Sequence, residues 1–182
     1  MPPSEGPFAI DRRALLRSAI LLVGGTTLPS AAFAASTTPF FADGERATLD
    51  LLCETMIPRT DTPGATDAGV SSFIDGLMTN WASSAHQEQM RRTIGSLGRA
   101  AQADTGKPLS ALSPAEREAW LTRQDAELIA AGDADYSQFK RLVMTGYYYS
   151  EPGATQELRY ELVPGVWEPS VPITAETRTW AA

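Results

Sequence analysis

The stretch VSSFIDGLMTNW, residues 70–81, carries the clearest structural signal in the sequence. Its large apolar residues occur at positions i, i+3, i+4, i+7, i+8 and i+11, which is the spacing of one face of an α-helix. Asp67 precedes the stretch and is expected to cap the helix, because its carboxylate can accept from a free backbone N–H. An amphipathic helix buries its apolar face against other elements, and the flanking sequence predicts more helices.

Four further segments show helical spacing or helix-start signals. SPAE, residues 113–116, is a capping box with proline at the first helical position. No segment alternates strongly enough between apolar and polar residues to predict a sheet. We therefore expect an all-α fold, a small bundle of about five helices in one domain, residues 35–149. Besides the helix at 70–81, the expected helices run from Asp43 to about Ile57, from about Ala85 to Asp104, from Ser113 to Gly132, and from Asp135 to Pro152-Gly153. Asp43 and Asp135 are expected to cap the helices that they begin.

Residues 150–182 differ in character from the helical part. They contain four prolines and two tryptophans, Trp167 and Trp180, with little periodicity. The segment is too aromatic for a disordered composition. We expect an extended C-terminal tail that packs on its own domain or on a partner subunit.

The N-terminal segment has the features of an export signal. Arg12-Arg13 precede two leucines and a short apolar run, and Ala32-Phe33-Ala34 is a small-x-small exit. Paired arginines in this position predict a twin-arginine signal over residues 1–34, cleaved between Ala34 and Ala35. A general secretory signal with two arginines is the alternative. Arg17 interrupts the apolar run, so a membrane anchor is not expected, and the predicted location is the periplasm.

The charge balance of the chain is acidic. The 182 residues have a formal net charge of −7. The predicted signal holds three of the 15 basic and two of the 22 acidic residues, which leaves the mature part near −8. The sequence has no basic patch, so binding to nucleic acid or to an anionic membrane surface is not expected.

Residues that commonly carry chemistry are scarce in this sequence. His86 is the only histidine and lies in a polar segment, where a solvated surface position is the preferred interpretation. Cys53 is the only cysteine and falls on an apolar helical stripe, which favours a buried thiol over an intermolecular bridge. The sequence has no CxxCH haem motif and no GxGxxG loop after a strand. We predict no catalytic residue, metal site or cofactor site in this chain, although a pair of acidic residues acting as in a glycosidase stays open.

Three consecutive tyrosines, Tyr147, Tyr148 and Tyr149, stand at the end of the last expected helix. Side chains of successive helical residues point in different directions, so all three cannot face one core. At least one ring is therefore exposed or meets a partner, a role that suits tyrosine. Partial burial of all three at a helix end is the alternative.

Two segments resemble the signatures of a known family. GYYYSEPGATQELRY (146–160), followed by VPGVWEPSVP (163–172), is similar to the C-terminal signature of the gluconate 2-dehydrogenase subunit 3 family. LLCETMIPRTDTPGA (51–65) resembles its N-terminal signature, with a helix, an Ile-Pro step and a loop. The family pattern has a cysteine directly before the Val-Pro of the tail, where this chain has Ser170. A thiol bridge from that position is therefore not available to this protein.

The resemblance implies a non-catalytic small subunit of a membrane-associated sugar, sugar-acid or polyol dehydrogenase complex. The implied partners are an FAD-dependent flavoprotein of the glucose-methanol-choline (GMC) type, a multihaem cytochrome c subunit and the twin-arginine translocase. The small subunit is expected to support folding of the flavoprotein and to carry it through the inner membrane. The residues expected at the partner interface are Tyr147, Tyr148, Tyr149, Glu151, Tyr160 and Trp167.

Two other functions remain open at this point. The chain could be a free-standing periplasmic enzyme that uses acidic residues, or a transient export chaperone that leaves after translocation. Turnover of a substrate by the isolated chain favours the first. Loss of the chain from the mature complex favours the second.

Overall fold

A computed structural model describes residues 38–160, 165, 170, 172–175 and 177–180. The predicted export residues Arg12 and Arg13, the cleavage residues Ala34 and Ala35, and Trp167 lie outside the described residues. The chain divides into two units, and the unit from Pro39 to Ala182 contains all the helices given below.

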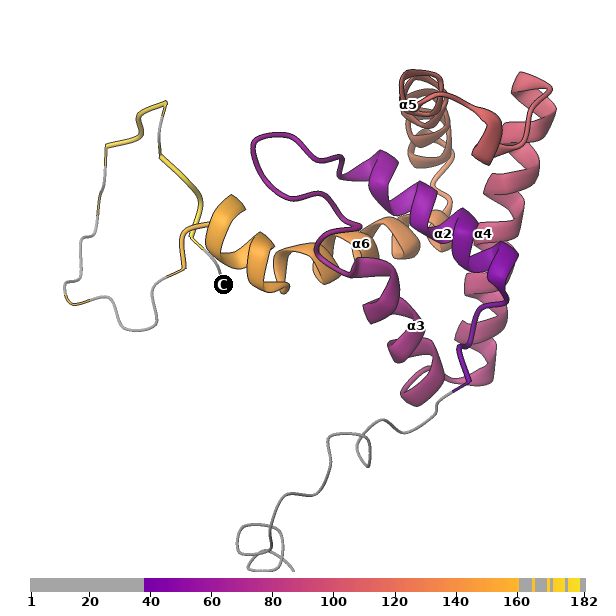
Figure 1. The fold of residues 1–182 in the computed structure, drawn as a ribbon, viewed down its shortest axis with the longest axis horizontal. Coiled ribbons are helices and arrows are strands. Elements are labelled where there is room, and N and C mark those ends of the chain that lie inside the picture. The colour runs from indigo at the N-terminus through magenta and orange to yellow at the C-terminus, as the bar shows by residue number, and fades with distance from the viewer. Residues whose placement is uncertain (1–37, 161–164, 166–169, 171, 176, 181–182) are drawn as a thin grey trace, which may run out of the picture. The chain divides into compact units, whose positions relative to one another are not determined.

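The described part of this second unit is built from helices (Figure 1). Two short turns, the 3-10 turn η2 (Leu109–Ala111) and the π-helical turn η3 (Gly153–Glu157), accompany the helices. The described residues contain no strand, only an isolated bridge between Arg159 and Trp180. The predicted all-α fold with about five helices is confirmed. The α-helices are α2 (Asp43–Met56), α3 (Val70–Asn80), α4 (Ser84–Thr105), α5 (Pro114–Ala130) and α6 (Ala134–Tyr148).

The predicted capping box at the start of α5 is present. The Oγ of Ser113 accepts from the Glu116 N–H at 3.3 Å, and the Glu116 carboxylate accepts from the Ser113 N–H at 2.7 Å. Pro114 is the first helical residue. Backbone and side-chain hydrogen bonds to Ser113, with Lys107 beside it, lower the pKa of Glu116 to about 2. This helix start depends on four neighbouring residues only, which is why the sequence predicted it.

Two of the other predicted caps are displaced. Asp43 is the first residue of α2 and Ala42 occupies the cap, with Glu45 accepting from the Ala42 N–H at 3.1 Å. The last helix is capped two residues earlier than predicted, by Asp133, whose carboxylate accepts from the Tyr136 N–H at 2.8 Å. At the start of α6 a neighbouring acidic side chain makes the cap bond, whereas at the start of α2 the cap residue Ala42 makes no such side-chain bond.

The prediction that Asp67 caps α3 is wrong. The helix begins at Val70, after Gly69, whose φ of 67° is in the left-handed region that favours glycine. The Asp67 carboxylate instead accepts from the Gly64 N–H at 3.1 Å and pairs with Arg59. Asp67 therefore organises the loop before α3.

The hydrophobic core lies among α2, α3, α4, α5 and α6. Trp120 and Tyr136 are its largest side chains, and each reaches a polar partner: Trp120 Nε1 donates to Asp104 at 2.9 Å and Tyr136 donates to Asp125 at 2.7 Å. The apolar face of α3 is only partly buried in this core. The buried members of its apolar stripe are Val70, Ile74 and Met78, whereas Phe73 and Trp81 are exposed.

None of the helices in the described part of the chain combines the length and the apolar character that crossing a bilayer requires.

Candidate partner-binding surface

Glu54 is the second carboxylate, besides Asp67, that holds the loop between α2 and α3. Glu54, in the last turns of α2, accepts from the Arg59 N–H at 3.3 Å and from the Thr66 N–H at 2.9 Å. The loop also closes on itself through the Ala65 N–H, which donates to the Ile57 carbonyl at 2.9 Å. Both ends of the loop are thus held at the C-terminal end of α2. Residues between these ends contact another element.

That other element is the end of α6 and the turn that follows it. The Tyr147 hydroxyl donates to the Pro63 carbonyl at 2.7 Å, and the Thr62 hydroxyl donates to the Glu157 carboxylate at 2.7 Å. Residues 54–67 and 146–157 therefore form one connected structure, which we call the signature junction. It joins the two segments that carried the family resemblance, which are about 90 residues apart in sequence.

Three glycines of the signature junction stand where a Cβ meets other atoms. An ideal Cβ on Gly153 would lie 2.0 Å from the Tyr147 carbonyl oxygen, and one on Gly64 would lie 2.7 Å from the Arg59 nitrogen. On Gly146 it would lie 2.9 Å from the Phe73 ring. The first two contacts involve backbone, which cannot rotate away. Gly153 and Gly64 are therefore required by packing, whereas the Phe73 ring beside Gly146 can move.

Ser150 links α6 to η3. Its hydroxyl donates to the Tyr147 carbonyl at 2.6 Å and accepts from the Gly153 N–H at 3.1 Å. The same carbonyl also accepts from the Ser150 N–H at 3.0 Å. The start of the predicted tail is thus a helical turn anchored to α6, and the part of the signature from Gly146 to Glu157 serves local structure.

The tyrosine run divides between core and surface. Tyr147 is 2% exposed and donates to Pro63, so its placement argues against the predicted partner contact for this ring. Tyr148 packs edge-to-face on Tyr147 with 5.4 Å between ring centroids, and its outer side is exposed. Tyr149 is 74% exposed. The exposed predicted interface residues that the structure describes are Tyr148, Tyr149, Glu151 and Tyr160.

The described part of the tail returns to the end of η3. The Arg159 N–H donates to the Thr179 carbonyl at 2.8 Å, and the Arg159 guanidinium lies 4.1 Å from the centroid of the Trp180 ring. Arg178 donates to the Gln156 carbonyl at 2.5 Å. The chain thus brings together residues 156–159 and 178–180. The Trp180 ring packs against the Arg159 guanidinium of the same chain.

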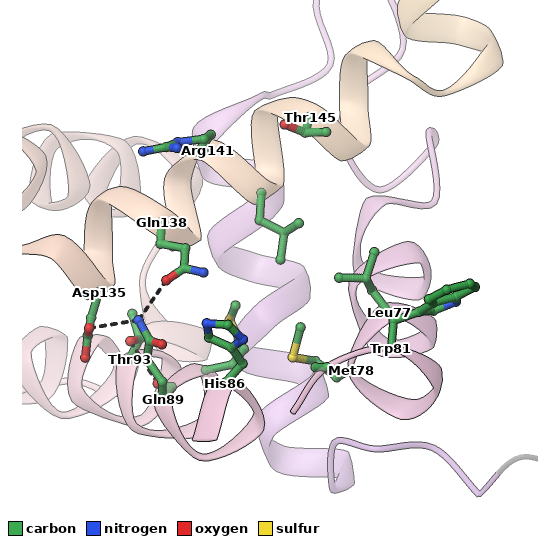
Figure 2. Close-up of a pocket in the computed structure, with 13 residues that line it drawn as sticks. Leu77, Met78, Trp81, His86, Gln89, Thr93, Asp135, Gln138, Arg141 and Thr145 are labelled. Carbon is green, nitrogen blue, oxygen red and sulfur yellow. Dashed lines mark hydrogen bonds between the residues drawn. The ribbon is translucent and has the colours of Figure 1, made fainter. Parts of the chain in front are cut away.

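A cavity of about 350 Å³ lies among α3, α4 and α6 (Figure 2). Leu77, Met78 and Trp81 line it from α3 and its C-terminal end, and Leu142 lines it from α6. On another side, Gln89 Nε2 donates to Asp135 at 2.8 Å and to Gln138 at 2.9 Å, which holds α4 to α6. His86 also lines the cavity and is exposed, as predicted.

Cys53 is a buried thiol, as the helical stripe predicted. It is free and fully buried, and desolvation raises its pKa to about 12, although Ser71 lowers it by hydrogen bonding. A thiol of this kind is unreactive, because the thiolate is the reactive form. Within the described ranges, no group of three or more His, Cys, Asp or Glu residues is placed to hold a metal ion.

Two features of this surface were missed from the sequence. Nothing in the sequence points to the role of Glu54, whose carboxylate accepts from two loop amides. Trp81 was treated as one member of an apolar stripe, but it lies just beyond the last residue of α3 and is 85% exposed. The position of Trp81 at the end of the pattern was the only sequence signal for its exposure.

The fold and the signature junction define a small all-α protein in which two signature segments meet in one hydrogen-bonded structure. The chain belongs to the gluconate 2-dehydrogenase subunit 3 family, because the model of that family matches residues 43–165, more than half of the chain. The predicted resemblance is confirmed. The family name is that of a subunit of an oxidoreductase complex, which implies a multisubunit assembly. No curated protein and no solved structure matches the chain.

Proposed function

We propose that this chain is the non-catalytic small subunit of an FAD-dependent sugar, sugar-acid or polyol dehydrogenase complex. It supports folding of the flavoprotein catalytic subunit and its co-export through the twin-arginine translocase, and it acts in the periplasm at the inner membrane. The family match over residues 43–165 carries the proposal. FAD belongs to the GMC-type partner and haem c to a cytochrome subunit, which this chain reaches indirectly.

Some motif residues make internal hydrogen bonds and others are exposed, and this difference supports the proposed role. The described part of the C-terminal signature is largely engaged in internal hydrogen bonds, through Tyr147, Ser150 and Glu157. Large aromatic side chains remain at the surface, among them Tyr148 and Tyr149. Exposed tyrosines and tryptophans are enriched in the contacts of assembled subunits. We assign the partner contact to these exposed rings, with Glu151, Tyr160 and Trp167.

Replacing the export residues tests the escort function. In the double variant Arg12→Lys, Arg13→Lys, we expect both this chain and the flavoprotein to stay in the cytoplasm, because one signal serves both. Fractionation followed by flavin fluorescence and dehydrogenase activity in each compartment measures this. Normal periplasmic activity of the flavoprotein in the double variant would refute co-export.

The neighbouring reading frames give a first check. We expect a flavoprotein with a nucleotide-binding GxGxxG and without an export signal, next to a protein with several CxxCH motifs. Substrate turnover by the purified small chain alone would favour the free-standing enzyme instead.

A further inference from the structure

An apolar groove runs between α3 and α6. Phe73 lies against α6 at Gly146, where an added Cβ would touch its ring. Leu77 and Trp81 follow one helical turn apart and line the cavity of Figure 2, which Leu142 of α6 also lines. We call this surface the α3–α6 groove and define it by Phe73, Leu77, Trp81, Leu142 and Thr145.

Two large aromatic side chains of the groove are exposed to solvent. Trp81 is 85% exposed and Phe73 is 41% exposed, although both belong to the stripe that sets the fold. Tyr149, the residue after the end of α6, is also exposed, at 74%. Exposed aromatics beside a hollow are typical of a protein–protein contact.

The charges at the rim indicate what the groove receives. Arg141 lines the cavity and is exposed, and it forms no ion pair with any other described residue. Asp135 also lines the cavity, and its carboxylate accepts from Gln89. In a chain of net charge −7, an exposed cation with no ion pair to another described residue is complementary to an acidic group on another molecule.

We propose that the α3–α6 groove is the docking site of the flavoprotein, and that the docked segment carries a large apolar side chain next to a carboxylate. The apolar side chain enters the cavity beside Leu77 and Leu142, Trp81 closes over it, and the carboxylate pairs with Arg141. This inference rests on the proposed function and adds which surface is used.

A second copy of this chain is a poorer occupant. In a two-fold contact the same patch meets itself, so residues near the axis face their own copies. An axis that passes close to Arg141 brings its two copies together, and their like charges repel. The acidic net charge of both copies adds to the repulsion.

The complex purified from the periplasm through a tag on this chain is the material for the test, with flavin absorbance as the marker of the partner. Dilution of the complex, followed by mass photometry, gives the dissociation constant. Truncating a tryptophan anchor lowers affinity by about 30-fold, so we expect this for Trp81→Ser. For Arg141→Glu we expect about tenfold, with a loss of salt dependence. Ile129→Ser and Arg123→Glu, two exposed residues of α5, are the matched controls and should leave the constant within about twofold.

Cross-linking identifies the occupant directly. A benzoylphenylalanine in place of Trp81 should, on illumination, join this chain to the flavin-containing subunit. Cross-links to a second copy or to residues 161–182 of the same chain would overturn the inference. A flavin-containing complex that tolerates Trp81→Ser and Arg141→Glu as well as the controls would do the same and leave the proposed function intact. Absence of flavin from the wild-type preparation would refute the proposed function, and the docking site with it.

Discussion

The signature junction and the α3–α6 groove are adjacent regions with opposite properties. In the junction, Tyr147, Ser150 and Gly153 are tied to each other and to the loop after α2 by short hydrogen bonds and close packing. In the groove, Trp81 and Phe73 are exposed. The comparison teaches that the residues which identify the family mainly build the scaffold. The surface proposed for the partner is recognised by exposure and unpaired charge.

The sharpest test of the junction is Gly153→Ala. The new methyl group would lie 2.0 Å from the Tyr147 carbonyl oxygen, so η3 has to move away from α6. We expect the free energy of unfolding to fall by about 3 kcal/mol, the upper end of ordinary overpacking. Urea denaturation followed by circular dichroism measures the change.

Gly76→Ala is the control for that substitution. Gly76 is inside α3 and has no atom within 4 Å of its ideal Cβ, so alanine should stabilise by about 0.5–1 kcal/mol through helix propensity. A loss below 1 kcal/mol in Gly153→Ala would mean that η3 relaxes freely and that the junction is not rigid.

Tyr147→Phe removes the hydrogen bond that ties α6 to the loop. The ring stays buried, but the Pro63 carbonyl loses its donor, which costs about 1 kcal/mol. Tyr149→Phe is the matched control, because Tyr149 is exposed and should lose almost nothing. Equal effects of the two substitutions would contradict the contrast between a bonded junction and an open surface.

Comparing the wild type with Tyr147→Phe at different pH values gives a second test of the junction. Burial, with the charge of Glu157, raises the pKa of the Tyr147 phenol above its ordinary value of 10.0, although Thr62 opposes this. A pKa raised in the folded state means that the contribution of the group is fully present below pH 10 and is lost as pH rises through the folded pKa. We expect the stability advantage of the wild type over Tyr147→Phe to shrink above pH 10. A constant difference up to pH 11 would contradict this.

The sequence predicted what depends on neighbours along the chain. The capping box at Ser113 and the helical spacing of residues 70–81 are local, and both are found. The cap assigned to Asp67 failed, because its carboxylate bonds to Gly64 and Arg59 in a loop whose shape depends on Glu54.

Long-range packing explains the misses at the candidate site. The need for glycine at position 153 arises from the Tyr147 carbonyl oxygen, which only the folded turn brings close. Trp81 shares the apolar spacing of α3, but it lies just beyond the last residue of the helix and is exposed. Hydrophobic spacing predicts which side chains share a helix face, but not how far the neighbouring helices extend over it.

Trp81→Ser sharpens the comparison from the side of the groove. Because Trp81 lies beyond the last residue of α3 and is 85% exposed, its removal should change the free energy of unfolding of the isolated chain by less than about 0.5 kcal/mol. Thermal unfolding of the purified chain measures this. A loss above 1 kcal/mol would show that Trp81 serves the fold and weaken its assignment to partner binding.

Gly146→Ala tests the boundary between the two regions. Gly146 belongs to the family signature, yet its Cβ would lie 2.9 Å from the Phe73 ring of the groove and 3.3 Å from buried Val70. The Phe73 ring can turn toward solvent, and alanine gains about 1 kcal/mol of helix propensity over glycine, so the two effects nearly cancel. We therefore expect stability within about 0.5 kcal/mol of the wild type, with a changed chemical shift of the Phe73 ring and weaker flavoprotein binding. If stability falls by 2 kcal/mol while binding is unchanged, Gly146 serves the scaffold alone, and the groove ends before it.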